Sequence, residues 1–131
     1  MTPEGFLDLE DVLQIHANQL RLYGGADGVR DPGLLESALA MPLAGFGGQL
    51  FHPTMFEQAA AYVFHIVKNH PFIDGNKRTG IATALVFLDL NGHDVVATTV
   101  ELVGLVLAVA EGRTDKVGIT AFFRGHARPK G

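Results

Sequence analysis

The sequence predicts an all-α fold of about six helices with one small hairpin, and three observations support this prediction. Apolar residues recur at helical spacing along most of the 131-residue chain. The periodic segments open on residues that cap helices, and glycine or proline follows several of them. The exception is a glycine-rich segment at residues 43–52, where the helical spacing is lost.

The first two helices are predicted from their ends. In "DLEDVLQIHANQLRLYGG", Asp8 can cap the start of a helix that Gly24 ends. Its apolar face consists of Leu9, Val12, Leu13, His16 and Leu20. In "RDPGLLESALAMP", Asp31 is a capping residue, and Pro32 occupies the first turn, where its missing N–H costs nothing. Pro42 ends this second helix.

Four further helices follow. "TMFEQAAAYVFHIVKNH" opens with Thr54 and Glu57 at the spacing of a capping box. "TGIATALVFLDLNG" is apolar nearly all round, which predicts a central helix buried by its neighbours. Thr98 and Glu101 form a second capping box for a helix reaching about Glu111, and "TDKVGITAFFRG" predicts a last short helix. We expect the basic tail "RGHARPKG" to be loose.

The segment at residues 43–52, "LAGFGGQLFH", is predicted to be a loop or a small hairpin, because glycines flank short apolar pairs. It is the candidate flap of the molecule. Its central residues are Gly45, Phe46, Gly47, Gly48, Gln49, Leu50 and Phe51.

Composition narrows the class of protein. A formal net charge of -4 gives no general attraction to nucleic acid or to anionic membranes. The absence of cysteine excludes disulfides and thiolate chemistry, and it fits a reducing compartment. The first residues do not resemble a signal peptide, and the apolar run 81–90 is far shorter than the roughly 20 residues of a spanning helix. We therefore expect one soluble cytoplasmic domain over residues 1–131, without direct nucleic-acid binding.

A polar stretch, "NHPFIDGNKRTG" at residues 69–80, separates the third and fourth helices. A helix start carries unpaired N–H groups and a partial positive charge, so Gly75, Asn76 and Lys77 at this junction predict an anion-binding turn. Lys77 and Arg78 project about 100° apart on a helix and can contact different oxygens of one ligand. A polyphosphate fits this arrangement better than a single carboxylate.

Two more residues of this stretch add chemistry to binding. Asp74 is suited to hold Mg²⁺, which takes one or two carboxylates together with phosphate oxygens. His70 can accept a proton from an attacking hydroxyl near neutral pH. Phe72, between them, is expected to point into the core and anchor the loop. A base, a metal carboxylate and an anion-binding turn together predict phosphoryl or nucleotidyl transfer.

Simpler interpretations exist for each part. His70 before proline can end a helix, Asp74 with Gly75 can be an ordinary turn, and Lys77 with Arg78 can be a solvated face. The combination favours a site, because a turn needs no histidine and a buried helix gains nothing from two cations at its start. A metal pair of His70 and Asp74 for hydrolysis is the weaker alternative. The other histidines considered, His16, His52, His65 and His93, are interpreted as scattered core or surface residues, of which only His52 or His65 could touch the site.

The segment "HPFIDGNKRTG" resembles the motif of the Fic superfamily, HxFx[DE]GNGRxxR, in the variant HxFxDxNKR of the Doc (death on curing) toxins. The segments "GVRDPGLLESALA", "FGGQLFHPTMFEQAAA", "FLDLNG" and "LVLAVAEG" also look like Doc segments, in Doc order. The resemblance implies an all-α Fic/Doc core with a small hairpin flap.

The resemblance also implies a role for each motif position. By resemblance, His70 is the catalytic base, Asp74 the Mg²⁺ ligand, Gly75 and Asn76 the phosphate-holding turn, Lys77 and Arg78 the cationic contacts to the nucleotide, and Phe72 the anchoring aromatic. The flap from Gly45 to Phe51 is implied to lie along the site and guide the target peptide.

Two positions depart from the AMP-transferring Fic pattern. Lys77 stands where those enzymes have glycine, and Ile81 stands where they have a second arginine. In Doc relatives this variant accompanies an inverted nucleotide, so the resemblance implies a kinase that uses ATP and Mg²⁺. The implied substrate is a threonine of the translation factor EF-Tu, whose phosphorylation arrests growth. Nucleotidyl transfer to a protein hydroxyl is the runner-up, and a catalytically inactive antitoxin-binding module is the alternative from another class.

Control of such an enzyme is expected to come from a second protein. Some Fic proteins carry an inhibitory helix with [ST]xxxE[GN], but here Leu107 stands at the Ser/Thr place before Glu111 and Gly112. The resemblance implies a separate antitoxin of the Phd type, whose C-terminal segment folds into a hydrophobic groove formed by the first helix and its neighbours.

Overall fold

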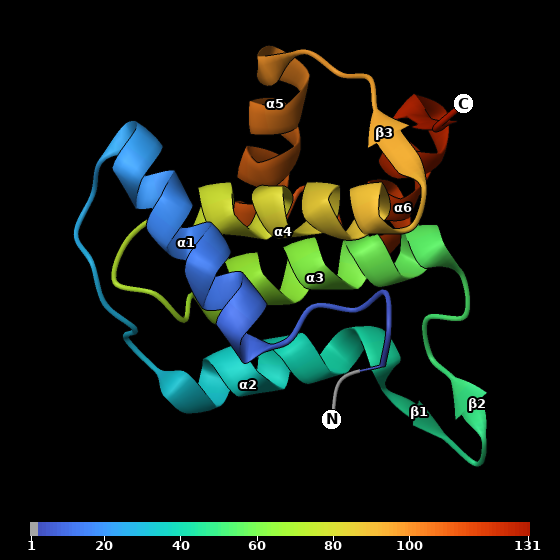
Figure 1. Cartoon of the computed structure of the whole chain (residues 1–131), viewed down its shortest axis with the longest axis horizontal. Helices are drawn as coiled ribbons and strands as arrows, with labels where there is room; N and C mark the ends of the chain where they lie inside the picture. The colour runs from blue at the N-terminus through green and yellow to red at the C-terminus, as the bar shows by residue number, and fades with distance from the viewer. Residues whose placement is uncertain (1–2) are drawn as a thin grey trace.

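The computed structural model describes residues 3–131, and the predicted all-α core is confirmed (Figure 1). Six helices follow one another along this part of the chain. They are α1 (Leu9–Tyr23), α2 (Pro32–Ala40), α3 (Met55–Asn69), α4 (Asn76–Leu90), α5 (Thr99–Ala110) and α6 (Lys116–His126), with a short 3-10 turn, η1 (Met41–Leu43), after α2. No helix within residues 3–131 has both the length and the apolar character needed to cross a bilayer.

Local capping explains where these helices begin. The Asp8 carboxylate accepts a hydrogen bond from the Asp11 N–H at the start of α1, and Gly24 ends that helix. Thr98 and Glu101 form the reciprocal capping box predicted for α5. The box predicted for α3 is only half formed, because the Glu57 carboxylate accepts from the Thr54 hydroxyl and not from the backbone.

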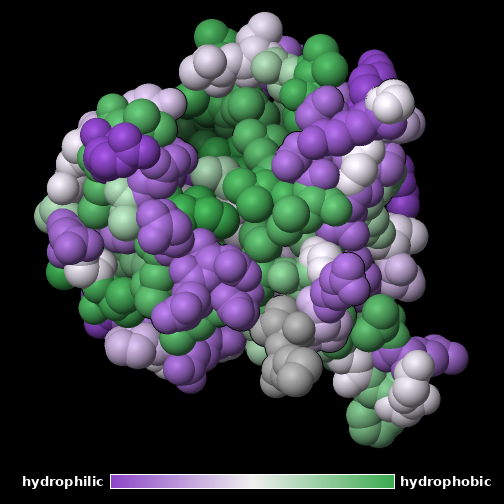
Figure 2. Space-filling view, viewed as in Figure 1, coloured by the Kyte–Doolittle hydropathy of each residue, from purple (hydrophilic) through white to green (hydrophobic). Residues whose placement is uncertain are grey.

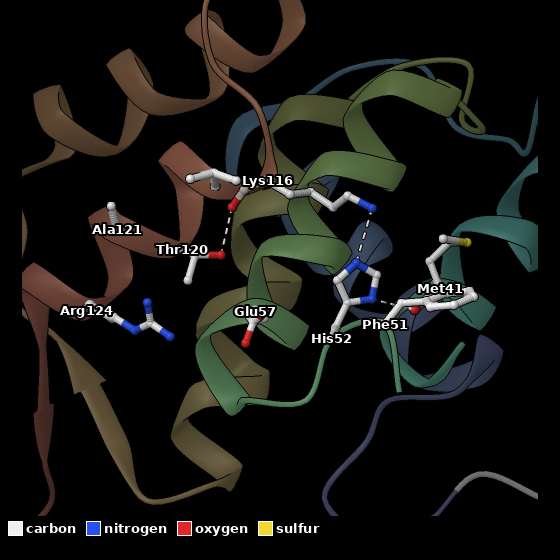
Figure 3. Close-up of a pocket in the computed structure, with 9 residues that line it drawn as sticks. Met41, Phe51, His52, Glu57, Lys116, Thr120, Ala121 and Arg124 are labelled. Atoms are coloured by element: carbon white, nitrogen blue, oxygen red, sulfur yellow. Dashed lines mark hydrogen bonds between the residues drawn. The ribbon is translucent and has the colours of Figure 1, made fainter. Parts of the chain in front are cut away.

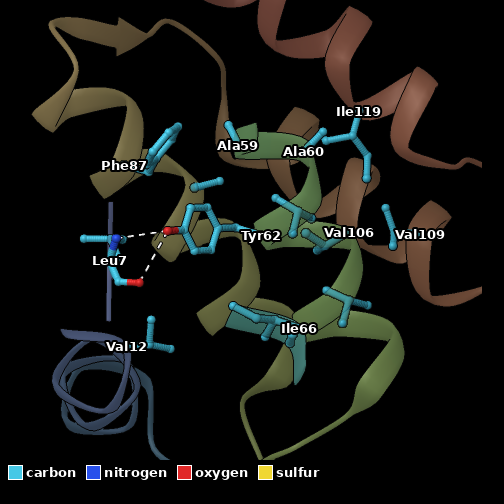
Figure 4. Close-up of a cluster of buried hydrophobic side chains, with 14 of the residues drawn as sticks. Leu7, Val12, Ala59, Ala60, Tyr62, Ile66, Phe87, Val106, Val109 and Ile119 are labelled. Carbon is cyan, nitrogen blue, oxygen red and sulfur yellow. Dashed lines mark hydrogen bonds between the residues drawn. The ribbon is translucent and has the colours of Figure 1, made fainter. Parts of the chain in front are cut away.

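The core lies between α3 and α4, which run side by side, with the other helices packed around this pair (Figures 1 and 4). The two helices approach closely at Gly80, since a Cβ atom there would lie 2.9 Å from a methyl group of Val67. Inside the core, the Tyr62 hydroxyl accepts the N–H of Leu7 at 2.9 Å, which ties the segment before α1 to α3.

Helix α4 differs from the prediction of a helix covered on all sides. Thr83, Phe87 and Leu88 are buried against α3 and neighbouring segments, but Val86 and Leu90 are exposed. Some apolar side chains of α4 are therefore not buried by other parts of the chain. Part of its apolar surface, at Ile81 and Leu85, faces a groove.

The flap is a hairpin, as predicted. Strands β1 (Gly45–Phe46) and β2 (Gln49–Leu50) pair antiparallel within the predicted segment 43–52. Gly47 and Gly48 form the two-residue turn at φ 62° and 82°. Such a turn needs positive φ at both positions, which glycine adopts without a steric cost.

A second two-stranded sheet corrects the prediction of a loose tail. Strand β4 (Ala127–Pro129) pairs antiparallel with β3 (His93–Val95), which follows α4. The N–H of Lys130 also donates to the Gly92 carbonyl at 2.8 Å. Three-residue strands are too short to show an alternating pattern, so the pairing depends on where α4 and α6 bring the two segments together.

Candidate active site

His70 occupies the C-terminal end of α3 in an unusual backbone conformation. Its φ of 51° and ψ of 53° lie in the left-handed helical region, and no other non-glycine residue among 3–131 has a positive φ. The conformation is held by Arg30, whose guanidinium donates to the carbonyls of His70 and Asn69 at 2.7 and 3.0 Å. The His70 side chain is exposed. A strained residue kept at a helix end with an accessible imidazole is typical of a functional position.

The loop after His70 is fixed by a segment far away in the sequence. Residues 28–31 run antiparallel beside residues 71–73. The backbone bonds run from Arg30 N–H and Asp31 N–H to the Pro71 carbonyl at 2.7 and 3.0 Å, and from Ile73 N–H to the Gly28 carbonyl at 3.0 Å. The loop between α1 and α2 therefore forms one wall of the motif loop.

Phe72 anchors the loop as predicted, and Asn76 braces it. The Phe72 side chain is fully buried in the core. Its backbone N–H donates to the Asn76 amide oxygen at 2.9 Å, and the Asn76 amide donates back to the Phe72 carbonyl at 3.0 Å. Both polar ends of this buried amide are thus used to close the loop. The Asn76 side chain therefore shapes the turn, which leaves only its backbone N–H as a donor to a ligand.

Asp74 is exposed but tightly oriented. One carboxylate oxygen accepts the N–H of Ala26 at 3.2 Å, and the other accepts the N–H of Gly75 at 2.8 Å. These two backbone bonds, followed by the charges of Arg78 and Lys77, lower the pKa of Asp74. The carboxylate is therefore ionised at neutral pH, and its remaining lone pairs suit a hard cation such as Mg²⁺.

The start of α4 has backbone N–H groups without a side-chain cap. Gly75 precedes the helix at φ 80°, and no side chain among residues 3–131 caps it. The first backbone bond of this turn is donated by Thr79 to the Gly75 carbonyl at 2.9 Å. The N–H groups of residues 76–78 therefore have no capping acceptor and lie at the positive end of the helix, and we call them the anion turn.

The two cations after the anion turn have different surroundings. Lys77 is exposed, whereas Arg78 is half-buried and donates to the Gly24 carbonyl at 3.0 Å. The Arg78 guanidinium also lies 5.8 Å from the centre of the Tyr23 ring. Arg78 is thus fixed against the end of α1, and Lys77 projects as the more adaptable charge.

Both cations line an apolar groove between α1, α4 and α5 with a volume of about 450 Å³. Figure 2 shows this groove as a hydrophobic hollow between α1 and α5. Tyr23 contributes from α1, Ile81 and Leu85 from α4, and Val103 and Leu107 from α5. The predicted groove at the first helix and its neighbours therefore exists, and it reaches the cations of the motif.

His52 and His65 do not join the motif. Their Nε2 atoms each lie 3.1 Å from the Lys116 ammonium (Figure 3 shows His52 and Lys116). Burial and this nearby charge lower the pKa of both imidazoles, to about 4 for His65. A hollow of about 620 Å³ beside them is lined by Phe51, His52 and residues of α6, and by no residue of the motif loop.

The alternative of a His70 and Asp74 metal pair for hydrolysis would need further ligands from outside these two residues. Within residues 3–131, no three side chains of histidine, cysteine, aspartate or glutamate gather as metal ligands. Asp74 is thus a single carboxylate beside the anion turn, which fits a Mg²⁺ ion that shares its ligands with phosphate oxygens and water.

Several residues of the site were not predicted from the sequence. His16 is buried in α1, and its Nε2 lies 2.8 Å from the Asp74 carbonyl oxygen. The Ala26 N–H and the Arg30 guanidinium reach the loop from the α1–α2 connection. Only His16 carried a signal, because a polar side chain on a predicted buried face requires a polar partner.

Comparison with known proteins agrees with this geometry. Residues 6–88 match the Fic/DOC family, and this span includes both the flap and the motif loop. The chain therefore belongs to the Fic/DOC family. It is 42% identical over 92 residues to Toxin Doc of Mycolicibacterium smegmatis. The aligned region covers 70% of this chain and 68% of that toxin. It is 33% identical over 103 residues to Protein kinase doc of Escherichia phage P1, covering 79% of this chain and 80% of that kinase. Both relatives place it in the Doc branch of the family.

Proposed function

We propose that the protein is the toxin of a toxin–antitoxin pair and acts as a protein kinase that uses ATP and Mg²⁺. The observation that carries the proposal is the uncapped start of α4, directly preceded by the ionised Asp74 and followed by Lys77 and Arg78. The names of the two relatives, one a toxin and one a protein kinase, support the same activity.

The phosphates of ATP are proposed to lie on the anion turn. Backbone N–H groups at a helix start orient phosphate oxygens without a change in the fold, because they are already in place. Lys77 and Arg78 contribute charge on different sides of the same ligand. Asp74 would hold Mg²⁺, which neutralises part of the phosphate charge when bound.

His70 is proposed to act as the general base. The hydroxyl oxygen of the target forms a bond to the γ-phosphorus, the bond from that phosphorus to the β–γ bridging oxygen breaks, and ADP leaves. His70 takes the proton of the hydroxyl in this step. Its exposed imidazole suits a protein substrate, because a bulky target can reach it. Such a base typically contributes about 10² to 10⁴ in rate.

The target is proposed to be a Ser or Thr of a translation factor, EF-Tu by family resemblance, so that modification arrests translation in the cytoplasm. By family resemblance, the flap is proposed to contact a protein substrate. Its side chains Phe46 and Phe51 are 84% and 60% exposed and are therefore accessible to a partner. The hairpin lies at the opposite end of α3 from His70 (Figure 1), which corrects the expectation that the flap from Gly45 to Phe51 lies along the site. A target segment on this flap would therefore have to run the length of α3 to reach His70.

The groove between α1, α4 and α5 is proposed to bind the antitoxin. A helix with an apolar face fits the hollow formed by Ile81, Leu85 and Val103. Lys77 and Arg78 at its edge favour acidic residues on that helix, and a helix seated there would lie next to the anion turn. We propose an antitoxin of the Phd type, whose segment folds on binding.

Labelled ATP tests the reaction. Purified protein is incubated with EF-Tu and Mg²⁺ and either α-labelled or γ-labelled ATP, with His70→Ala as the matched control. Transfer of only the γ-label, absent in the control, supports the kinase. Transfer of the α-label shows nucleotidyl transfer in its place. Absence of both labels, with His70→Ala as toxic to cells as the parent protein, would favour an inactive binding module.

A second experiment tests the groove. Leu107→Glu introduces a charge into the apolar wall of the groove, away from His70 and Asp74. We expect cells that express this variant to be rescued less well by the co-expressed antitoxin, while toxicity without antitoxin is unchanged. Val117→Glu, at an exposed position on α6 outside the groove, is the control. Equal rescue of both variants would contradict the proposed antitoxin site.

A further inference from the structure

His16 contacts the motif loop at two points from beneath. It is 3% exposed, and its imidazole stacks on the buried Phe72 ring with centres 3.8 Å apart and planes 7° from parallel. Its Nε2 lies 2.8 Å from the Asp74 carbonyl oxygen. A carbonyl oxygen only accepts hydrogen bonds, so the proton in this bond is on Nε2. The ring is therefore held in one tautomer and one orientation.

The hydrogen bond from His16 to the Asp74 carbonyl fixes the plane of the Asp74–Gly75 peptide. The C=O of Asp74 and the N–H of Gly75 belong to the same trans peptide unit and point in opposite directions. With the C=O directed at His16, the N–H of Gly75 points away from α1, and it donates to the Asp74 carboxylate at 2.8 Å. The contact to His16 thus determines which group faces the carboxylate.

The backbone alone would not hold this plane. A rotation of the peptide unit changes φ of Gly75, and glycine tolerates either sign of φ. After such a flip, the Asp74 carbonyl oxygen would face its own carboxylate and repel it. The N–H of Gly75 would be lost from the site, and the start of the anion turn would change direction. Leu20 packs beside Gly75 but offers no polar contact.

We propose that His16 is a positioning residue that locks the Asp74–Gly75 peptide plane and thereby orients the metal-binding carboxylate. This inference rests on the proposed function for its catalytic meaning. His16 contacts neither the nucleotide nor the target in this account. It acts through Asp74, so its loss should raise the Mg²⁺ requirement of ATP binding and not simply lower the stability of the protein.

Three substitutions separate the contributions of His16. His16→Phe keeps an aromatic ring on Phe72 but removes the donor. His16→Leu removes both. His16→Gln keeps an N–H donor and a flat polar group. Val12→Ala, one turn earlier on the same buried face of α1, removes core packing but no hydrogen-bond donor to the loop, and it is the matched control.

Two measurements are compared for each variant. Calorimetry of ATP binding at increasing Mg²⁺ gives the Mg²⁺ concentration for half-saturation. NMR of the full chain gives the hydrogen-exchange protection of the Gly75 amide. For His16→Phe and His16→Leu we expect about a five- to tenfold higher Mg²⁺ requirement and a comparable loss of Gly75 protection. His16→Gln and Val12→Ala should stay within about twofold of the parent protein.

The outcomes distinguish the inference from the proposed function. Unchanged Gly75 protection in His16→Phe and His16→Leu would overturn the inference, as would a Mg²⁺ requirement that follows thermal stability in all variants, Val12→Ala included. Absence of ATP binding by the parent protein would refute the proposed function, while the Gly75 measurement would still decide whether His16 locks the peptide plane.

Discussion

Asn76→Asp tests whether a buried amide holds the motif loop closed. The Asn76 side chain accepts the N–H of Phe72 at 2.9 Å and donates to the carbonyl of Phe72 at 3.0 Å. Aspartate has the same shape and keeps the acceptor. At neutral pH, however, it places a second acceptor against the Phe72 carbonyl, where the parent protein has a donor.

The expected cost is large for an isosteric change. One buried hydrogen bond is lost, the Phe72 carbonyl is left unpaired, and a charge enters a buried position. We expect the free energy of unfolding to fall by roughly 2–4 kcal/mol at pH 7. The burial raises the folded-state pKa of the introduced carboxyl above its value in the unfolded chain. The deficit is therefore smallest below about pH 4, where the protonated group can donate to the Phe72 carbonyl, and it grows as the pH rises.

Urea unfolding of Asn76→Asp and the parent protein at several pH values measures this difference. Asn18→Asp is the control, because Asn18 lies near the surface of α1 and pairs with Arg21, which accepts a carboxylate equally well. We expect the control to stay within about 0.5 kcal/mol of the parent protein. If Asn76→Asp is as stable as the parent at pH 7, or if the deficit does not shrink in acid, the amide does not hold the loop as described.

Three further predictions concern the wall of the site, the histidine cluster and the exposed cation. A Cβ atom on Gly25, at φ 121°, would lie 2.8 Å from the Asp74 carboxylate. Gly25→Ala should therefore weaken Mg²⁺-dependent ATP binding, measured by calorimetry, about tenfold or more. Gly24→Ala is the control and should only lower stability, because Gly24 also has a positive φ, 79°, but a Cβ atom there would meet open space. Equal binding by both variants would contradict this account. Because the pKa of His65 is lowered to about 4, the unfolded chain takes up a proton first as the pH falls, and stability should decrease from about pH 6.5 to about pH 4. Lys116→Met should make this decrease in the free energy of unfolding with falling pH smaller, as measured by urea unfolding. An unchanged pH dependence would show that the Lys116 charge does not act on His65. Lys77→Gly should reduce γ-phosphate transfer and allow some nucleotide transfer, which intact-mass spectrometry of the target detects; a target carrying only phosphate at the parent level would refute the role of Lys77.

The elements that were predictable from the sequence are those held by local contacts. Asp8, Asp31 and Thr98 each cap a helix through the N–H three residues later, so their effect depends on neighbouring residues alone. The hairpin at Gly47 and Gly48 was predictable for the same reason, because the turn type is a property of the two glycines. The motif residues follow one another directly, and the start of α4 brings them together.

The contacts that were not predictable join residues far apart in the chain. The N–H of Ala26 reaches Asp74 across 48 positions, and the Arg30 guanidinium reaches the His70 carbonyl across 40. Neither has a signature in its own neighbourhood. Strand β4 was missed because its pairing with β3 depends on the packing of α6. The two hydrogen bonds between the Asn76 amide and the Phe72 backbone were also not predicted, because they form only when the loop has folded back on the start of α4.

The amino-acid sequence by itself determined the helices, the hairpin and the chemical content of the motif, because capping, hydrophobic period and turn geometry act over a few residues. Only the tertiary structure decided how the motif is oriented. The direction of the Asp74 carboxylate, the left-handed conformation of His70 and the plane of the Gly75 peptide each depend on groups from α1 or from the segment after it. Those groups reach the loop only once apolar burial has packed α1 against α4, so their roles come from the assembled core.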